Sequence, residues 1–462
     1  MDLVNSPIPM DVNQLYLNGS YTSPHSTEFY SVFNPKDNSL VADRVSIADD
    51  IDVDNAVTFA EAAFRGPWGG FSAADRSGCF YRLVDLLEKQ LTDILYLDSL
   101  TTGNPVSLIP NLQLPSLLCV CVAINPYNSP VASLFIKAAP CLATGNVLIV
   151  KPSEKSPLGS LAVASLFERA GFPPGVVQIL TGDGRTGARL ASHMRVRKIS
   201  FTGSVATGKK IQVAAANSNL KRVTLELGGK SPAIVFEDAD VKNAVNWAVN
   251  GILARTGQVC VAPSRIYVQR SISRKFIELY CEAMRDAAEE IGDPQVTTTK
   301  FGPLVDSEAF ERVQSMINRA KNESTLVIGG SRIGDKGCFL EPTVFLHPNV
   351  DAEIYKKEVF GPVSGLKMFD SEEEVIELAN DTEYGLMAGV FTRDINRAIR
   401  VAGKIESGTV GINCVSVVVN EGQMNVQAPF GGKKQSGTGR EFGEYVLRSF
   451  TEPKTILINM AA

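Results

Sequence analysis

The chain has 462 residues, of which 44% are hydrophobic and 21% are charged, so it can form a globular protein with two domains. The formal net charge is −5, and no basic block is present that would neutralise a run of phosphates. Nucleic acid is therefore not an expected partner. The most apolar stretch, 117–150, is interrupted by prolines, asparagines and a lysine, so we expect no membrane span there.

The N-terminal segment and the cysteines indicate the compartment. Residues 1–14 are acidic and contain prolines, unlike a signal or transit peptide. The eight cysteines are scattered and form no CxxC pair, as in proteins of a reducing compartment. The three histidines are too scattered to suggest a zinc site, so no metal is expected. We expect a cytoplasmic protein and, if it is an enzyme, a carboxylate as its general base.

The first half of the chain alternates between predicted strands and helices. The opening segment, up to about residue 105, contains a short strand-like piece at 15–19. It also contains two helical stretches, at 53–64 and 76–100. Short apolar strands follow at 117–124, 146–150, 176–180, 198–201 and 223–225. Helical patterns lie between them at 157–170, 187–193 and 206–216. This order predicts a parallel, doubly wound sheet that binds ligands at the carboxyl ends of its strands.

A second α/β region is predicted from about residue 230. Its expected helices lie at 241–255, 273–291, 307–319, 372–380 and 395–404. Its expected strands lie at 265–268, 344–346, 363–369 and 408–413. The tail, 454–459, has the pattern of a lone strand, which needs the edge of another sheet as a partner.

Two residues suggest covalent catalysis. Cys260 lies on the loop between the predicted helix 241–255 and the predicted strand 265–268, where a thiol can reach a substrate. Glu226 ends the predicted strand 223–225 and is followed by two glycines, which allow close backbone approach. A thiolate attacks a carbonyl, and a carboxylate can activate the water that releases the resulting thioester. The alternatives are a buried structural cysteine and a solvated surface glutamate.

Asn128 lies between two prolines just after the first parallel strand. An amide held rigidly in this way can donate a hydrogen bond to a developing oxyanion. The alternative is an ordinary turn, since asparagine and proline are common in turns.

Two glycine-rich loops compete as the phosphate site. Residues 182–187 form a GxGxxG pattern after a strand, but no acidic residue is suitably placed about 20 residues later. We therefore interpret this loop as a turn near the adenine. Residues 201–208 open a helix whose N-terminal N–H groups can bind an anion. Lys151 and Glu154 follow the second parallel strand, where they can bond ribose hydroxyls or simply form a solvated loop.

These segments resemble the motifs of the NAD(P)-dependent aldehyde dehydrogenase superfamily, in the family's order. The segment 125–130 is similar to PWNFP, with Tyr127 and Ser129 in place of its two aromatic residues. The other matches are KPxExxP at 151–157, FTGSxxxG at 201–208, ELGGKSP at 226–232, GQxC at 257–260, ExFGP at 358–362 and PFGGxKxSG at 429–437. The resemblance covers nearly the whole chain.

The resemblance implies the fold and its domains. It implies an α/β fold like that of aldehyde dehydrogenases, with a Rossmann-like cofactor domain, an α/β catalytic domain and an oligomerisation β-flap, which a short connection after Pro105 would leave incomplete. The NAD-binding domain would span 1–228, and the catalytic domain 229–433. Residues 434–451 would return to the NAD-binding domain, and 452–462 would form the oligomerisation strand.

The resemblance also assigns roles to individual residues. Cys260 would be the nucleophile, Glu226 the general base, and Asn128, with the N–H of Cys260, the oxyanion hole. Lys137 and Glu441 align with a proton relay, although a structural ion pair is the alternative for both. The implied cofactor contacts are Ile124, Lys151, Ser153, Glu154, Gly184, Phe201, Gly203, Ser204, Leu227, Glu358 and Phe360. A glutamate at position 154 repels a 2′-phosphate and so favours NAD over NADP.

The implied reaction is NAD-dependent oxidation of an aldehyde to a carboxylic acid through a cysteine thiohemiacetal and a thioester. The pocket departs from the family where Ser129, Ile136 and Ala254 replace positions that are often aromatic, so a bulky aldehyde is expected. The loop 414–428 is longer than usual and lies near the substrate mouth in the family. Two other functions stay open. A relative that transfers the acyl group to coenzyme A is disfavoured by Glu226, and an inactive scaffold is disfavoured by the complete catalytic set.

A short connection follows Pro105. In the family, several tens of residues separate the counterpart of this proline from the next strand, whereas only 106–114 intervene here. Either the gene has lost a segment, or the sequence derives from a faulty or alternative splice model. The missing part normally holds a helix and much of the oligomerisation hairpin, so a homo-oligomer is expected to be weakened.

Overall fold

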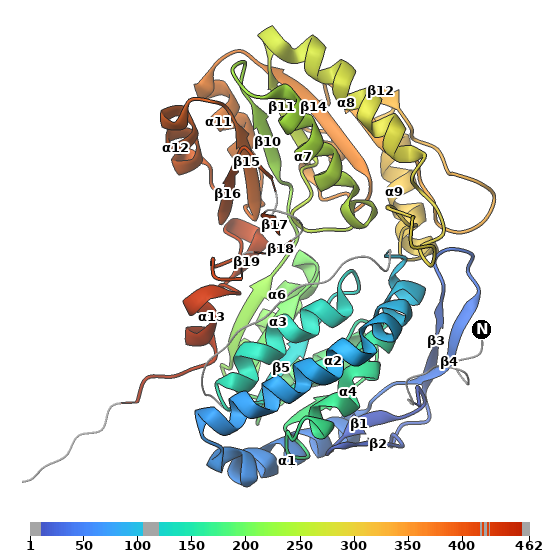
Figure 1. The fold of residues 1–462 in the computed structure, drawn as a ribbon, viewed down its shortest axis with the longest axis vertical. Helices are drawn as coiled ribbons and strands as arrows, with labels where there is room; N and C mark the ends of the chain where they lie inside the picture. The colour runs from blue at the N-terminus through green and yellow to red at the C-terminus, as the bar shows by residue number, and fades with distance from the viewer. Residues whose placement is uncertain (1–10, 105–119, 416–417, 420–422, 425, 455–462) are drawn as a thin grey trace, which may run out of the picture.

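The computed structural model describes residues 11–104, 120–415, 418–419, 423–424 and 426–454. They form two α/β halves, each built around its own sheet (Figure 1). The short connection at 106–116, the start of the strand expected at 117–124 and most of the expected terminal strand lie outside these residues.

The first sheet has the strand order β19-β9-β8-β5-β6-β7-β1-β2. Its centre is parallel and consists of β5 (Val120–Ile124), β6 (Val147–Lys151), β7 (Val177–Ile179), β8 (Lys198–Thr202) and β9 (Arg222–Glu226). Antiparallel edges are added by β1 (Leu15–Leu17), β2 (Ser20–Thr22) and β19 (Gly437–Thr438). The first parallel strand, β5, lies between β6 and β8. The strand order therefore reverses at the carboxyl end of β5, where such sheets bind their ligands.

Helices cover this sheet in two groups. The helices α2 (Ala73–Thr102), α3 (Pro130–Ala143) and α4 (Leu158–Arg169) pack against one another in front of the strands (Figure 1). The helices α5 (Gly184–Ser192) and α6 (Val205–Asn217) form a second group, in which they contact each other and α5 also contacts α1 (Asp50–Arg65). The strands β5 and β6 are buried along their whole length, because both faces of the sheet are covered.

The second sheet has the order β12-β13-β14-β11-β10-β15-β16. All its strands are parallel except the edge strand β12 (Thr325–Ile328), and they are β10 (Pro232–Val235), β11 (Arg265–Gln269), β13 (Thr343–Leu346), β14 (Val363–Phe369), β15 (Met387–Phe391) and β16 (Thr409–Ile412). Side chains alternate along β10: Ala233 and Val235 join the core formed with α7 (Val241–Leu253) and α8 (Ser273–Ala288). Ile234 joins the core on the opposite face, which is built with α9 (Ser307–Ala320), α10 (Glu353–Lys356), α11 (Glu372–Asn380) and α12 (Ile395–Lys404).

Smaller elements complete the described chain. The strands β3 (Phe29–Phe33) and β4 (Leu40–Ser46) form an antiparallel pair, as do β17 (Val418–Val419) and β18 (Gln423–Met424). The helix α13 (Gly443–Ser449) lies against α3, so the end of the chain returns to the first half.

The expected fold class is confirmed, but several elements were missed. The helix α3 was not predicted, because it is buried on nearly all sides and therefore lacks the polar face that marks a helix in a sequence. The strands β10 and β15 were missed because each is a short apolar run with a proline or glycine. The GxGxxG segment was wrongly interpreted as a turn. Its glycine at 184 begins α5, and the Asp183 side chain caps that helix.

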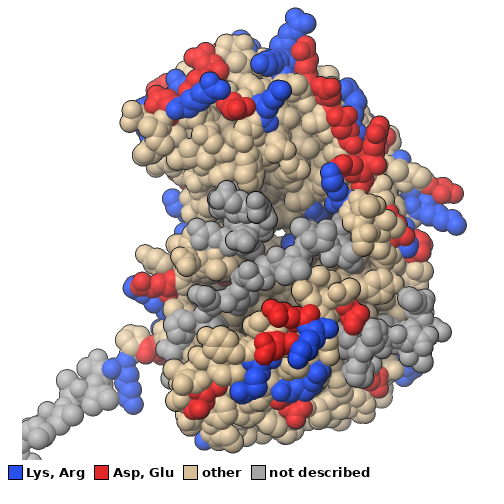
Figure 2. All heavy atoms as spheres, in the orientation of Figure 1, with Lys and Arg blue, Asp and Glu red and all other residues tan. Residues whose placement is uncertain are grey.

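No helix among the described residues is both long and apolar enough to cross a membrane. On the face drawn in Figure 2, basic and acidic side chains are intermixed over the outer parts of both halves.

Candidate active site

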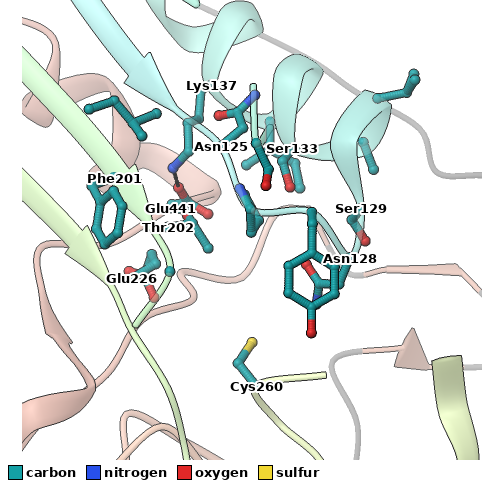
Figure 3. Close-up of a pocket in the computed structure, with 18 of the residues that line it drawn as sticks. Asn125, Asn128, Ser129, Ser133, Lys137, Phe201, Thr202, Glu226, Cys260 and Glu441 are labelled. Carbon is teal, nitrogen blue, oxygen red and sulfur yellow. Dashed lines mark hydrogen bonds and ion pairs between the residues drawn. The ribbon is translucent and has the colours of Figure 1, made fainter. Parts of the chain in front are cut away.

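The helix α7 ends a few residues before Cys260, and a tight turn follows it. The helix ends at Leu253, and Arg255, Thr256 and Gly257 adopt left-handed backbone angles, with φ values of 48°, 57° and 74°. This differs from the helix expected to reach residue 255. A Cβ at Gly257 would overlap the carbonyl of Gly361, so the tight turn requires glycine there. The turn presents the half-buried Cys260 thiol to the space between the two halves (Figure 3).

Gln258 fixes this loop to its surroundings. Its Nε2 donates to the Arg255 carbonyl at 3.1 Å, and its Oε1 accepts from the Val305 N–H at 3.0 Å and from the Tyr127 hydroxyl at 3.2 Å. Its own carbonyl accepts a 2.7 Å hydrogen bond from Asn128 Nδ2. Asn128 comes from the loop after β5 of the first half. The amide is therefore held beside the thiol by a bond that joins the two halves.

Glu226 is the last residue of β9 and only 4% exposed. Neither of its carboxylate oxygens has a hydrogen-bond partner among the described residues. Burial, and then the negative charge of Glu441, raise the pKa of Glu226 well above its usual value. It was expected as a strand-end residue near Cys260, and it lies beside the space into which that thiol points (Figure 3).

The two glycines after Glu226 are needed for close contacts. A Cβ at Gly228 would overlap the carboxylate of Glu358, and a Cβ at Gly229 would overlap the carbonyl of Cys260. The N–H of Gly229 donates to Glu358 Oε1 at 2.9 Å. The glycines therefore let the chain pass close to the backbone of Cys260 and to the buried acid.

The Cys260 thiol is buried close to acidic side chains, and both features affect its pKa. Burial, followed by the charges of Glu358 and Glu226, raises the pKa of Cys260 to about 12. Burial also raises the pKa of Glu358 to about 7, although the Gly229 N–H and Lys230 oppose this rise. With this pKa, the thiol is protonated at neutral pH.

Lys137 and Glu441 form a buried ion pair beside Glu226. Lys137, on α3, is 2% exposed and lies 2.5 Å from Glu441 Oε1. Its Nζ also donates to Ser200 Oγ at 2.9 Å. Lys137 lowers the pKa of Glu226 and Glu441 raises it, so the pair lies within electrostatic range of that carboxyl.

The residues that we expect to bind the cofactor lie at the carboxyl ends of the strands in the first sheet. Lys151 ends β6, and its Nζ forms a 3.0 Å ion pair with Glu154. Ser204 caps α6 by accepting from the Thr207 N–H at 3.3 Å, so that the N-terminus of a 13-residue helix begins at this point. At the other glycine-rich loop, the carboxylate of Asp183 accepts from the Arg185 N–H at 2.8 Å and places a negative charge at the start of α5, so that helix start is a poor phosphate site.

One cavity of about 2,370 Å³ joins these groups. A typical small-molecule pocket measures roughly 300–1,000 Å³, so this cavity has room for a dinucleotide and a second ligand. Every residue expected in catalysis or cofactor binding lines it: Ile124, Asn128, Lys137, Lys151, Ser153, Glu154, Gly184, Phe201, Gly203, Ser204, Glu226, Leu227, Cys260, Glu358, Phe360 and Glu441. Among the described residues, no group of three or more histidine, cysteine, aspartate or glutamate side chains is placed to hold a metal ion.

Sequence reasoning missed the residues that position this site. Gln258 was noted only as part of a motif, because its main partners lie 45 or more residues away in the chain. Tyr127 was noted only as a substitution, yet its ring meets Phe360 edge to face at 5.9 Å between centroids. No pattern in the sequence connects these positions, since only the tertiary fold brings them together.

The fold and the site match a known class of enzyme. The model of the aldehyde dehydrogenase family matches residues 21–111 and 111–456. The chain therefore belongs to the aldehyde dehydrogenase family, a class of oxidoreductases in which a catalytic cysteine and a thioester are typical.

Individual relatives are similar along nearly their whole length. Aldehyde dehydrogenase 1A1 of Oryctolagus cuniculus is 39% identical over 494 aligned positions, covering 98% of this chain and 97% of that protein. An aldehyde dehydrogenase of Agaricus bisporus is 37% identical, covering 96% and 95%. The rabbit alignment is longer than the 462 residues of this chain, so the rabbit protein has residues that this chain lacks.

Solved structures show the same fold. The NAD⁺ complex of an aldehyde dehydrogenase from Bacillus cereus superposes with a TM-score of 0.91 at 36% identity, covering 99% of this chain and 98% of that one. The aldehyde dehydrogenase KauB from Pseudomonas aeruginosa gives a TM-score of 0.90 at 35% identity, covering 97% of each chain.

Proposed function

We propose that this protein oxidises a bulky aldehyde to a carboxylic acid with NAD, through a thioester on Cys260. The observation that carries the proposal is the convergence of the Cys260 thiol, the Asn128 amide and the Glu226 carboxyl on one cavity. These are a nucleophile, an oxyanion donor and a base, which are the groups that thioester chemistry requires.

The Cys260 sulfur acts first: once the thiol has lost its proton, the thiolate attacks the aldehyde carbon and the carbonyl oxygen takes up the negative charge. An amide NH₂ has two donors, and one hydrogen of Asn128 Nδ2 is used by the Gln258 carbonyl. The other hydrogen is available to the oxyanion, together with the N–H of Cys260. The bond to Gln258 fixes the direction in which that donor points, so it requires no reorganisation during the reaction.

Glu226 then activates the water that hydrolyses the thioester. A raised pKa makes its carboxylate a stronger base towards water, although a smaller fraction is ionised at neutral pH. Hydrolysis needs such a base, whereas transfer to coenzyme A does not, so the presence of Glu226 in the cavity supports the hydrolytic outcome. Lys137 and Glu441 are assigned to removing the proton, because both act on the charge of Glu226.

The residues of the cavity fit NAD. NAD supplies a hydride acceptor and, when bound, a cationic ring that would favour the Cys260 thiolate. Lys151 and Glu154 would hold the adenine ribose, the N-terminus of α6 after Ser204 would face the pyrophosphate, and Glu358 would bond the nicotinamide ribose. Gly228 supports this fit, since a side chain there would displace the Glu358 carboxylate.

The preference for NAD over NADP is assigned to Glu154. Replacing Glu154 by alanine removes a charge that would repel a 2′-phosphate, and we expect the ratio of kcat/KM for NADP to that for NAD to rise about tenfold. Glu444→Ala is a matched control, because Glu444 is an exposed carboxylate on α13 that pairs with Arg448, and neither residue lines the cavity. An unchanged ratio in Glu154→Ala would remove this assignment.

The proposed size of the substrate rests on Ser129, Ile136 and Ala254, which all line the cavity. The test is NADH formation at 340 nm with acetaldehyde and with long-chain and bicyclic aldehydes. We expect the larger aldehydes to have the higher kcat/KM. A clear preference for acetaldehyde would contradict the bulky substrate, and silence with every aldehyde would contradict the activity.

We further assign residues 1–228 and 434–451 to the cofactor domain, 229–433 to the catalytic domain and 452–462 to an oligomerisation strand. The pairing of β19 with β9 and the contact of α13 with α3 support the return of the chain to the first domain. We place the protein in the cytoplasm, as a weakened homo-oligomer.

A further inference from the structure

An arginine lines the cavity close to the nucleophile without a carboxylate bound to it. The Arg255 side chain is partly buried, and its Nη1 donates to the Ser129 hydroxyl. No ion pair among the described residues includes this guanidinium. Burial lowers the pKa of Arg255, whereas the charges of Asp98 and Cys260 raise it, so these acids are its electrostatic neighbours. Ser129 takes one of its five N–H donors, and the other four make no hydrogen bond among the described residues.

The start of α3 adds to the positive potential at the same place. Ser129 occupies the N-cap position, where a serine side chain ordinarily accepts from the first helical N–H groups. Here that hydroxyl makes no capping bond and accepts from Arg255 instead. The first helical residue, Pro130, has no N–H. The next two residues, Val131 and Ala132, line the cavity, so an uncapped end of a 14-residue helix lies beside the guanidinium.

We propose that Arg255 and the N-terminus of α3 bind a carboxylate carried by the substrate, so that the preferred aldehyde is an aldehyde acid. This inference rests on the proposed function and specifies its substrate class. The small residue at position 129 thus does more than enlarge the pocket, since it admits a cationic group at a wall that an aromatic ring would otherwise cover. The guanidinium fork matches the two oxygens of a carboxylate.

Asp98 is an acid within electrostatic range of the same guanidinium. Its Oδ1 is buried with no hydrogen-bond partner among the described residues, and burial raises the pKa of Asp98 to about 7. A single arginine with an acid nearby offers at most one unit of positive charge, which fits a singly charged carboxylate better than a doubly charged phosphate.

The test compares aldehydes that differ only at the far end. For chains of four to eight carbons, kcat/KM is measured for the ω-carboxylic acid, its methyl ester and the ω-phosphate. We expect the wild type to prefer the acid over the ester by at least tenfold at the best chain length. Arg255→Met should lower this ratio by about 10–100-fold, mainly through KM, since a charge-assisted hydrogen bond contributes about 1.5–3 kcal/mol. Arg255→Lys, which keeps the charge without the fork, should lie between the two.

Two further variants sharpen the comparison. Asp98→Asn removes the competing acid and should raise the acid-to-ester ratio several-fold. Arg185→Met is the matched control, because Arg185 lines the same cavity at the adenine side and should leave the ratio unchanged. A wild-type ratio near one, a stronger preference for the phosphate, or an equal ratio in wild type and Arg255→Met would each overturn the proposal.

A binding measurement separates this inference from the proposed function. Dissociation constants of glutarate and adipate, and of their dimethyl esters, are measured by calorimetry for the wild type and Arg255→Met. Tighter binding of the diacids that is lost in the variant supports the carboxylate site even if no aldehyde is oxidised. Equal binding of diacids and diesters overturns it, whatever the enzymatic activity.

Discussion

Cys260→Ala is expected to abolish aldehyde-dependent NADH formation, with a loss of about 10⁴-fold or more. The thiol is the group that bonds to the carbonyl carbon, and the oxyanion donors beside it have nothing to stabilise without that bond. The loss should appear in the first turnover as well as in the steady state. Stopped-flow absorbance at 340 nm with saturating NAD and aldehyde measures both.

The control for this loss is Cys281→Ala. Cys281 is a buried thiol on α8 that does not line the cavity, so its removal tests for a general effect of deleting a thiol. We expect this variant to keep its activity. If Cys260→Ala instead turned over at the wild-type rate, Cys260 would not be the nucleophile.

Glu226→Gln should separate the two halves of the reaction. The amide has nearly the same shape as the carboxyl but cannot act as a base. We expect a burst of about one NADH per active site, followed by a steady state slowed by about 10²–10⁴-fold. The burst arises because the thioester still forms and its hydrolysis lacks an activated water. Intact-protein mass spectrometry should detect the acylated enzyme, and a burst slowed as much as the steady state would contradict this role.

The pH dependence of the wild type follows from the same carboxyl. Burial and Glu441 raise the pKa of Glu226, and only the ionised form can accept a proton. Hydrolysis should therefore speed up as the pH rises through that raised pKa and slow down as the pH falls below it. In Glu226→Gln, the rate of the slow hydrolysis that follows the burst should no longer rise with pH in this range.

Much of the fold could be predicted because the parallel strands are continuous apolar runs. The strands β5 and β6 are buried on both faces, and such runs are clear in a sequence. The helix α3 was missed for the same reason, since a helix buried all round has no amphipathic period. Local patterns thus indicated where the chain is buried, but not always which element is buried there.

The individual residues of the candidate site could be predicted from the sequence, but the contacts between them could not. Cys260 and Glu226 could be predicted because each lies in a loop or at a strand end, within a segment that resembles a motif of the family. The bond from Asn128 to the Gln258 carbonyl joins residues 130 positions apart, and the contact of Arg255 with Ser129 joins residues 126 apart. Neither contact follows from spacing, because each depends on how the two sheets are placed against each other.

The buried pair of Lys137 and Glu441 has a consequence for synthesis on the ribosome. The two residues lie 304 positions apart, and the whole second sheet is encoded between them. During synthesis, Lys137 therefore has no ion-pair partner until Glu441, near the end of the chain, has been added. β9 likewise lacks β19 until that point. The first half therefore cannot reach its final form ahead of the second, and a nascent chain stalled before residue 437 carries an unbalanced charge in its core.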